Sequence, residues 1–198
     1  MTIRKHACYG ILGLVSLLGL GITQSARANF IATINQVGTD VVVTGSGTID
    51  LTGLSFFANG SAPSAMIIPI QGLLALNHGP VQFYANISGP FSFGMGGTTL
   101  ASSSSGDAVG LEGLGSNRLF VPSGYLSGNP LSDTSTYNNE TFASLGITPG
   151  TYTWTWGTGI HADSFTLQIV PEPSTLALLA VAGTGVGLLA YRRWRATR

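Results

Sequence analysis

Acidic side chains are the first candidates for chemistry in the stretch between the two apolar ends of this chain. Asp107, Glu112 and Glu140 could supply the two carboxyl groups with which a glycosidase flanks a sugar bond. Nothing in their spacing favours such a pair, because Asp107 and Glu112 fall in sequence typical of loops. Serines are abundant, but no Gly-x-Ser-x-Gly elbow lies between a strand and a helix with triad partners. The sequence therefore predicts no catalytic residue, and a hydrolase with a site in the loops of residues 88–139 is the least favoured function.

Two histidines, His78 and His161, are the candidate metal ligands of the same stretch. His161 lies two residues before Asp163, and a metal ion could bind between them. Two ligands on one hairpin are too few for a closed site, since a structural zinc takes four. The pattern favours a turn histidine in solvent, and we predict neither a metal ion nor a cofactor.

Aromatic side chains form a row near the end of this stretch, where Tyr152, Trp154 and Trp156 alternate with threonines. Successive strand residues point to opposite faces, so the three rings share one face. Such a row could be a sugar-stacking platform, which together with Tyr125 would make the protein a carbohydrate-binding module. It could equally be half of a sandwich core, and the threonines opposite are typical of a wet face. Burial is the favoured interpretation.

The charge of the central stretch excludes several partners. The whole chain has no net charge, but residues 29–170 contain no lysine, one arginine and seven acidic residues, which gives a net charge of −6. Without a basic patch, such a domain is a poor partner for nucleic acid or anionic lipid. The single cysteine, Cys8, lies outside this stretch, so no disulfide is available to it.

The N-terminal end has the layout of a secretory signal peptide. Arg4 and Lys5 precede an apolar run over residues 7–22, and the segment ends in Ala26-Arg27-Ala28. This order of a charged, an apolar and a small-residue region predicts a signal peptide over residues 1–28 that is cleaved after Ala28. The alternative is an uncleaved N-terminal membrane anchor.

The C-terminal end combines a proline motif, an apolar run and a basic cluster. Pro171-Glu172-Pro173 is followed by an apolar run from Leu176 to Tyr191 and by Arg192, Arg193 and Arg195. The run of 16 residues gives a helix of about 24 Å, a little less than a bilayer core of about 30 Å. Interfacial residues on both sides allow it to span, and the arginines should stay in the cytoplasm. We predict a single transmembrane helix over residues 176–191.

This C-terminal order closely resembles the PEP-CTERM sorting signal of Gram-negative bacteria, with residues 171–198 as the sorting segment. The resemblance implies an exported protein that an exosortase, a membrane protease-transpeptidase, processes at or near Pro171-Glu172-Pro173. Local sequences such as Gly45-Ser46-Gly47, Gly89-Pro90-Phe91 and Pro149-Gly150-Thr151-Tyr152 are similar to one uncharacterised group of PEP-CTERM proteins. That similarity covers most of residues 29–170 and implies no known activity.

The elements between the two ends indicate one all-β domain over residues 29–170, an antiparallel β-sandwich of jelly-roll-like or Ig-like type. Alternation over residues 30–54 with a turn at Gly38-Thr39-Asp40 predicts a hairpin. Residues 65–76 could form two short buried strands or one broken helix. Residues 88–116 and 124–139 are predicted to be loops, the first with short strand pieces. The sequence Ile147–Tyr152 resembles the tyrosine corner of β-sandwich domains.

Together these patterns predict an exported, surface-delivered, non-enzymatic protein. Its expected partners are the secretion machinery, the exosortase, the membrane as a transient anchor and, by family resemblance, extracellular polysaccharide. The expected route is an inner-membrane precursor followed by release to the cell surface or medium. A permanent single-pass anchor is the alternative for the tail, and a carbohydrate-binding module is the alternative for the domain.

Overall fold

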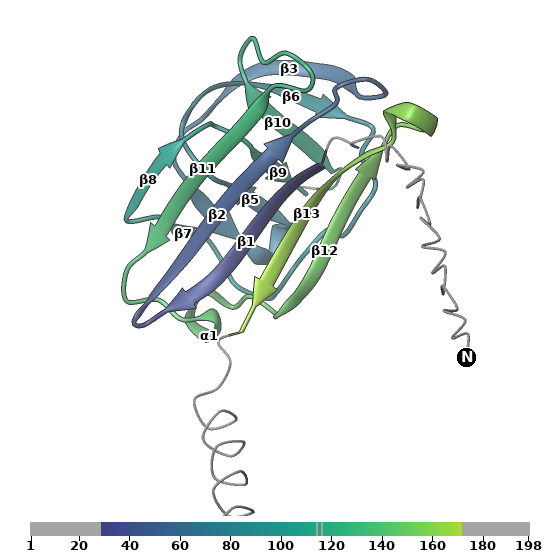
Figure 1. Cartoon of the computed structure of the whole chain (residues 1–198). Helices are drawn as coiled ribbons and strands as arrows, with labels where there is room; N and C mark the ends of the chain where they lie inside the picture. Colours follow the sequence, from purple (N-terminus) through teal and green to yellow (C-terminus); the bar gives the residue numbers. More distant parts are fainter. Residues whose placement is uncertain (1–28, 114, 116, 172–198) are drawn as a thin grey trace, which may run out of the picture.

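Thirteen strands in two sheets make up the computed structural model, which describes residues 29–113, 115 and 117–171. The first sheet has six strands in the order β12 (Gly150–Trp156), β13 (Asp163–Val170), β1 (Asn29–Val37), β2 (Asp40–Thr48), β11 (Pro130–Tyr137), β8 (Ser103–Gly106). The second has seven in the order β3 (Ser55–Ala62), β6 (Gly79–Ala85), β10 (Arg118–Pro122), β9 (Gly110–Glu112), β5 (Leu73–Ala75), β4 (Met66–Ile68), β7 (Thr99–Leu100). Figure 1 shows the two sheets as facing layers, which confirms the all-β prediction.

Helical structure is confined to three short segments of the described chain: α1 (Phe142–Leu145), η1 (Pro69–Gln71) and η2 (Gly159–His161). Within the described residues, no helix is long and apolar enough to cross a membrane. The predicted signal peptide over residues 1–28 and the predicted transmembrane helix over residues 176–191 lie outside those residues.

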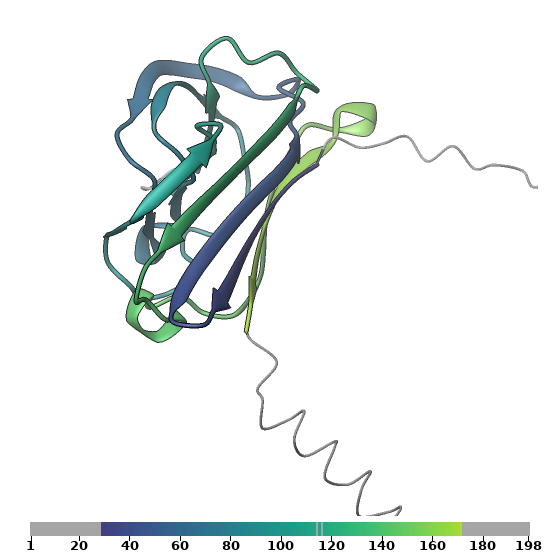
Figure 2. The ribbon, with the colours of Figure 1, turned by 60° about the vertical axis from the view of Figure 1, so that its left-hand side comes forward.

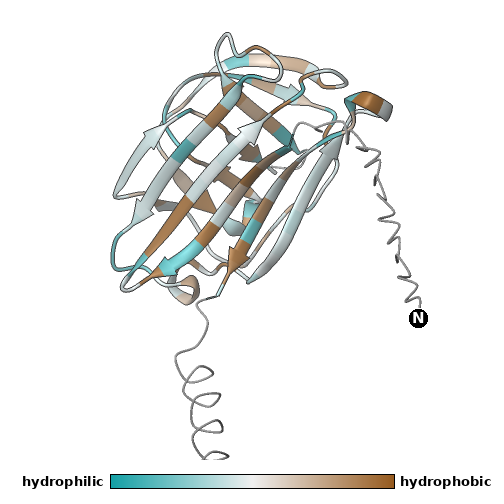
Figure 3. Ribbon diagram, in the orientation of Figure 1, coloured by the Kyte–Doolittle hydropathy of each residue, from teal (hydrophilic) through white to brown (hydrophobic). Residues whose placement is uncertain are grey.

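The core lies between the sheets and follows the predicted alternation. In β1, Phe30, Ala32 and Ile34 are completely buried. The hairpin that β1 forms with β2 turns at Gly38 and Thr39, as predicted. Figure 3 shows apolar and polar residues alternating along these strands. The period of two therefore places one side of each strand in the core and the other in solvent.

The first and last strands pair in parallel, which corrects the prediction of a purely antiparallel sandwich. Asn29 lies opposite Ser164 and Asn35 opposite Val170, while every other strand pair of the described chain is antiparallel. The chain therefore enters the sandwich at one end and leaves it at the other (Figures 1 and 2). We call the end near Asn29 and Asp163 the entry pole and the end near Val37 and Val170 the exit pole.

Strand β11 occupies part of the predicted loop 124–139, and that prediction was wrong. The strand runs between β2 and β8 in the six-stranded sheet. Its inward positions are Leu131, Asp133, Ser135 and Tyr137, all buried. Two of these four are polar, so the hydrophobic alternation that identifies a half-buried strand is missing from the sequence.

Two other segments also form strands, one of which the sequence left undecided and one of which it predicted as a loop with short strand pieces. Residues 65–76 form the short strands β4 and β5, which pair around η1, so the two-strand alternative is the correct one. The serine run at residues 102–105 overlaps edge strand β8, which pairs with β11. Serine has little intrinsic preference for strands, so this pairing is set by the neighbouring strand.

Asp133 is an ionisable group inside the sandwich. It is 7% exposed, and neither carboxylate oxygen has a hydrogen-bond partner of good geometry. A Cβ added at Gly45 of β2 would lie 2.8 Å from these oxygens, so the glycine makes room for the carboxyl group. Burial raises the pKa of Asp133 to about 7, Asp107 acts in the same direction, and the Gly45 backbone opposes them.

The predicted tyrosine corner is present at the exit pole. The Tyr152 hydroxyl, at the start of β12, donates a hydrogen bond of 3.0 Å to the Thr148 carbonyl oxygen, four residues earlier. The Thr148 amide in turn donates to the Phe93 carbonyl at 2.9 Å. The corner thereby ties the chain before β12 to a loop that precedes β7.

Replacing this tyrosine tests the corner. Tyr152→Phe removes the hydroxyl and leaves the ring, so the free energy of unfolding should fall by about 0.5–1.5 kcal/mol. Urea unfolding measures the loss. The control is Tyr84→Phe, whose hydroxyl makes only a 3.5 Å contact with Gln82, and an equal loss there would contradict a specific role for the corner.

Removing the buried carboxyl group should change how stability depends on pH. The Asp133 pKa is about 7 in the folded protein against an ordinary 3.8, so native stability falls as the pH rises from about 4 to about 7. Asp133→Asn cannot ionise and should be about 2 kcal/mol more stable than the native protein at pH 8. The gain should vanish at pH 4.

Denaturant unfolding at both pH values measures the effect. The control is Asp40→Asn on the exposed β1–β2 turn, which should not reproduce the gain at pH 8. A gain of the same size at pH 4 and pH 8 would show that the carboxyl group is not the cause.

Candidate functional site

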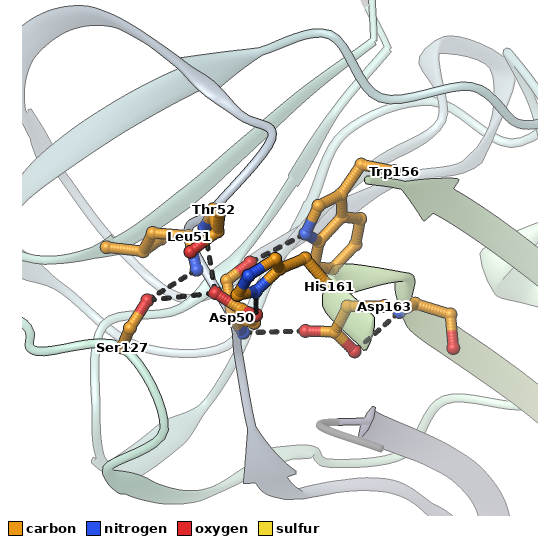
Figure 4. A network of polar contacts seen from close by, with 8 residues as sticks. Asp50, Leu51, Thr52, Ser127, Trp156, His161 and Asp163 are labelled. Carbon is orange, nitrogen blue, oxygen red and sulfur yellow. Dashed lines mark hydrogen bonds and ion pairs between the residues drawn. The ribbon is translucent and has the colours of Figure 1, made fainter. Parts of the chain in front are cut away.

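Three loops converge at the entry pole and bring together side chains that are far apart in the sequence. They follow β2 (residues 49–54), precede β11 (residues 123–129) and join β12 to β13 (residues 157–162). Each loop is placed by a strand of the six-stranded sheet that ends or begins at this pole. Figure 4 shows the polar contacts that result, most of which involve Asp50.

The Asp50 carboxylate is the hub of this network. One oxygen, Oδ2, lies 2.8 Å from His161 Nδ1. The other, Oδ1, accepts hydrogen bonds from the Thr52 amide at 2.8 Å and from Ser127 Oγ at 3.3 Å. The Asp50 carboxylate therefore holds its own loop to the other two loops of the pole.

The Asp50 backbone extends the network into the core. Its amide donates to Asp163 Oδ2 at 2.6 Å, and its carbonyl accepts from Trp156 Nε1 at 2.7 Å. Ser127 Oγ also accepts from the Leu51 amide at 2.6 Å. We refer to Asp50, Leu51, Thr52, Ser127, Trp156, His161 and Asp163 as the Asp50 network.

The two carboxyl groups of the network have opposite pKa shifts. Burial raises the pKa of Asp50, but hydrogen bonds from His161 and Thr52 outweigh that effect and lower it to about 2. Burial raises the pKa of Asp163 to about 6, and the Asp50 charge adds to the rise against hydrogen bonds from the Asp50 and Ser164 amides. Asp50 is therefore ionised at every ordinary pH, whereas Asp163 gains a proton in mild acid.

The geometry of the network suits structure better than catalysis. His161 is bound to a carboxylate through Nδ1, as in a catalytic triad, and its side chain is 47% exposed. A triad also needs a nucleophile on the other ring nitrogen. Ser127 instead donates to Asp50 and accepts from Leu51. Among the residues described, no group of three His, Cys, Asp or Glu side chains is arranged to hold a metal ion.

His161 lies exposed in the short turn segment η2, as the sequence predicted. The sequence did not predict that its ring contacts Asp50, 111 residues earlier. Asp50 and Ser127 were not candidates at all, because no local pattern joins residues that only strand pairing brings together. The other histidine, His78, places its Nδ1 3.1 Å from Asn77 Oδ1.

The carboxylates that could have formed a glycosidase pair lie on different elements with separate partners. Asp107 accepts from the Ser132 amide at 2.8 Å. Glu112 on β9 faces Arg118 on β10 at 3.8 Å. Glu140 accepts from Ser144 at the start of α1, near the exit pole. No interaction joins any two of these three carboxylates.

The aromatic row is part of the core, so burial was the correct interpretation. Trp154 and Trp156 are 1% and 5% exposed, and their indole nitrogens donate to the Pro90 and Asp50 carbonyls at 2.9 and 2.7 Å. Tyr125 is partly buried, and its hydroxyl contacts the Ile49 backbone and donates to the Asn129 carbonyl at 2.6 Å. These rings cannot serve as an exposed sugar platform.

The predicted processing motif begins where the folded strands stop. Val170 is the last residue of β13, and Pro171 follows it in an exposed position. Strand β13 lies between β12 and β1, so the motif is attached to an interior strand. The other predicted sorting and cleavage residues lie outside the described residues: Ala26, Ala28, Glu172, Pro173, Arg192, Arg193 and Arg195.

The described chain is thus an all-β domain whose last strand is followed directly by an exposed proline, Pro171. A family model described as the PEP-CTERM protein-sorting motif matches residues 170–195. The chain carries this motif, which confirms the resemblance and implies an exported protein that an exosortase sorts by way of a membrane-anchored precursor. Neither a curated protein nor a solved structure matches the chain.

The lowered pKa of Asp50 makes a testable contribution to acid stability. Its ionised form stabilises the folded state above about pH 4, and this stabilisation is lost as the pH falls towards 2. Asp50→Asn should lower the free energy of unfolding at pH 6 by about 1–3 kcal/mol. It should also flatten the fall in stability between pH 4 and pH 2.

Urea unfolding across this pH range measures both effects. The raised pKa values of Asp133 and Asp163 act mainly above pH 4, outside this window. The control is Glu140→Gln near the exit pole, which should keep the steep acid limb. An Asp50→Asn variant with the native pH profile would contradict the assigned role of the carboxylate.

Proposed function

We propose that this chain is the precursor of an exported, surface-delivered, non-enzymatic β-sandwich protein that associates with extracellular polysaccharide. The observation that carries this proposal is the sorting motif at residues 170–195, which starts at the last residue of β13. A signal at that position delivers everything before it as one folded unit.

The proposal includes a definite membrane topology. A signal peptide over residues 1–28 starts export and is removed after Ala28, and the helix over residues 176–191 then halts it. Arg192, Arg193 and Arg195 remain in the cytoplasm. The exosortase then acts near Pro171-Glu172-Pro173, where prolines keep the backbone extended and accessible to a protease.

The described geometry supports this order of events. Only residues 171–175 separate β13 from the helix, a reach of at most about 18 Å, so the exit pole stays near the membrane before cleavage. Strand β13 has eight residues and spans about 26 Å, which is the separation of the two poles along this strand. The cleavage segment is therefore the part of the domain nearest to the anchor.

The non-enzymatic part of the proposal is supported by how the reactive side chains are used. The Asp50 carboxylate is engaged by Ser127 and His161, and these contacts join three loops. Glu112 pairs with Arg118. A polysaccharide partner is supported by the family resemblance. A carbohydrate-binding module is the second candidate function, and its rings must differ from the buried Trp154 and Trp156.

Mass spectrometry of the protein from its native host tests the processing route. Chains with an N-terminus at Asn29 and a C-terminus between Val170 and Ser174 are expected. Replacing Pro171-Glu172-Pro173 by three alanines should leave the full-length precursor in the membrane fraction. The control is Pro130→Ala at the start of β11, at the opposite entry pole, which should be processed normally. Recovery of mainly native chains that end at Arg198 would refute processing and leave a permanent anchor.

A further inference from the structure

Phe91 stands between two surface grooves that the sequence did not indicate. Its ring is 58% exposed, although the loop that carries it is held in place on several sides. One groove has a volume of about 780 Å³ and is lined by residues 85–89, Phe91, Gly115 and Asn117. The other has a volume of about 450 Å³ and is lined by Ile70, Gln71, Phe91, Gly113 and Gly115. Both volumes lie within the range of about 300–1,000 Å³ typical of ligand sites.

The floor of the larger groove is fixed before any ligand arrives. A Cβ added at Gly89 would lie 2.5 Å from the Trp154 ring, so the buried indole supports the loop directly from below. Asn117 Nδ2 donates to the Gly89 carbonyl at 2.8 Å. Asn86 adopts a left-handed backbone with φ of 70° and donates to Ser55 Oγ at 2.7 Å. A rigid floor lowers the entropy lost on binding.

Among the described lining residues of the two grooves, no side chain is ionisable. The lining offers the Phe91 ring, amides from Asn86 and Gln71, and the exposed hydroxyl of Ser88. Asn117 is 8% exposed, and its Oδ1 has no hydrogen-bond partner within the described chain. With a net charge of −6 over residues 29–170, an anionic ligand would be repelled. The chemistry therefore fits a neutral ligand that both donates and accepts hydrogen bonds.

A peptide strand is a poor fit, because the backbone groups of this loop are already occupied. Ser88 exchanges two hydrogen bonds with Thr155, at 2.9 and 2.8 Å. The Gly89 and Pro90 carbonyls accept from Asn117 and Trp154. Peptide binding by strand addition needs a row of free backbone groups, and all three carbonyls along residues 88–90 already accept hydrogen bonds.

We propose that the two grooves on either side of Phe91 bind a neutral polysaccharide chain, with one sugar ring stacked on the Phe91 face. The C–H groups on the face of a sugar ring make weak contacts with an aromatic face. The sugar hydroxyls match the amides of Asn86 and Gln71 and the hydroxyl of Ser88, which donate or accept as required. This site deepens the proposed polysaccharide association and rests on it for its biological meaning.

The test uses the full chain in a zwitterionic detergent without sugar groups. Isothermal titration measures binding of four neutral probes, namely cellohexaose, xylohexaose, maltohexaose and laminarihexaose, and of polygalacturonate as the anionic probe. At least one neutral probe should bind, and polygalacturonate should not. Phe91→Ala should weaken that binding at least tenfold, and Phe91→Tyr should retain it.

The control is Leu100→Ala on β7, a side chain of equal exposure (57%) that lines neither groove, and it should bind like the native chain. Thermal unfolding of each variant shows whether the fold is kept. Failure of all four neutral probes, tighter binding of polygalacturonate, or unchanged binding by a folded Phe91→Ala would overturn the proposal. The two proposals can fail separately. Glycan binding tests the grooves, whereas mass spectrometry of the C-terminus tests the sorting route and needs no glycan.

Discussion

The parallel pairing of β1 with β13 is the constraint on which the rest of this structure depends. It joins the first described residue, Asn29, to Ser164, and it places both strands in the interior of one sheet. Strand β13 lies between β12 and β1. Without it, β1 would be an edge strand with unpaired backbone groups, and β12 would have no neighbour in the sheet. Contacts across 135 residues make this a fold of high contact order, which is expected to form slowly. The sorting motif follows directly after the strand that completes the sheet.

The same pairing separates the two ends of the domain into different tasks. The exit pole carries the tyrosine corner and the processing segment, whereas the entry pole carries loops fixed by the Asp50 network. Because the chain enters and leaves at opposite poles, the start of the sorting motif and the Asp50 network lie at opposite ends of the domain. The polar contacts of the Asp50 network hold three loops together that are far apart in the sequence.

The fold retains polar side chains inside the sandwich, although burying them lowers the stability of the folded state. Strand β11 carries Asp133, Ser135 and Tyr137 on its inward side, and side-chain oxygens of all three lack hydrogen-bond partners. Such groups oppose folding unless they are satisfied. Backbone pairing of β11 with β2 over eight positions provides the compensating interaction. The strand is therefore held by its ladder more than by its side chains.

The sequence by itself determined the all-β class, the β1–β2 hairpin, the tyrosine corner, the inward aromatic row and the C-terminal sorting motif. These features depend on local periodicity or on short motifs, which are legible within about ten residues. Only the tertiary structure decided the parallel pairing of β1 with β13, the strand character of β11 and the contact of Asp50 with His161. It also decided that Phe91 is exposed while Trp154 is buried beneath the same loop. The reason is physical: strand register and loop convergence arise from contacts between residues far apart in the chain, and local composition carries no signal of which distant residues will meet.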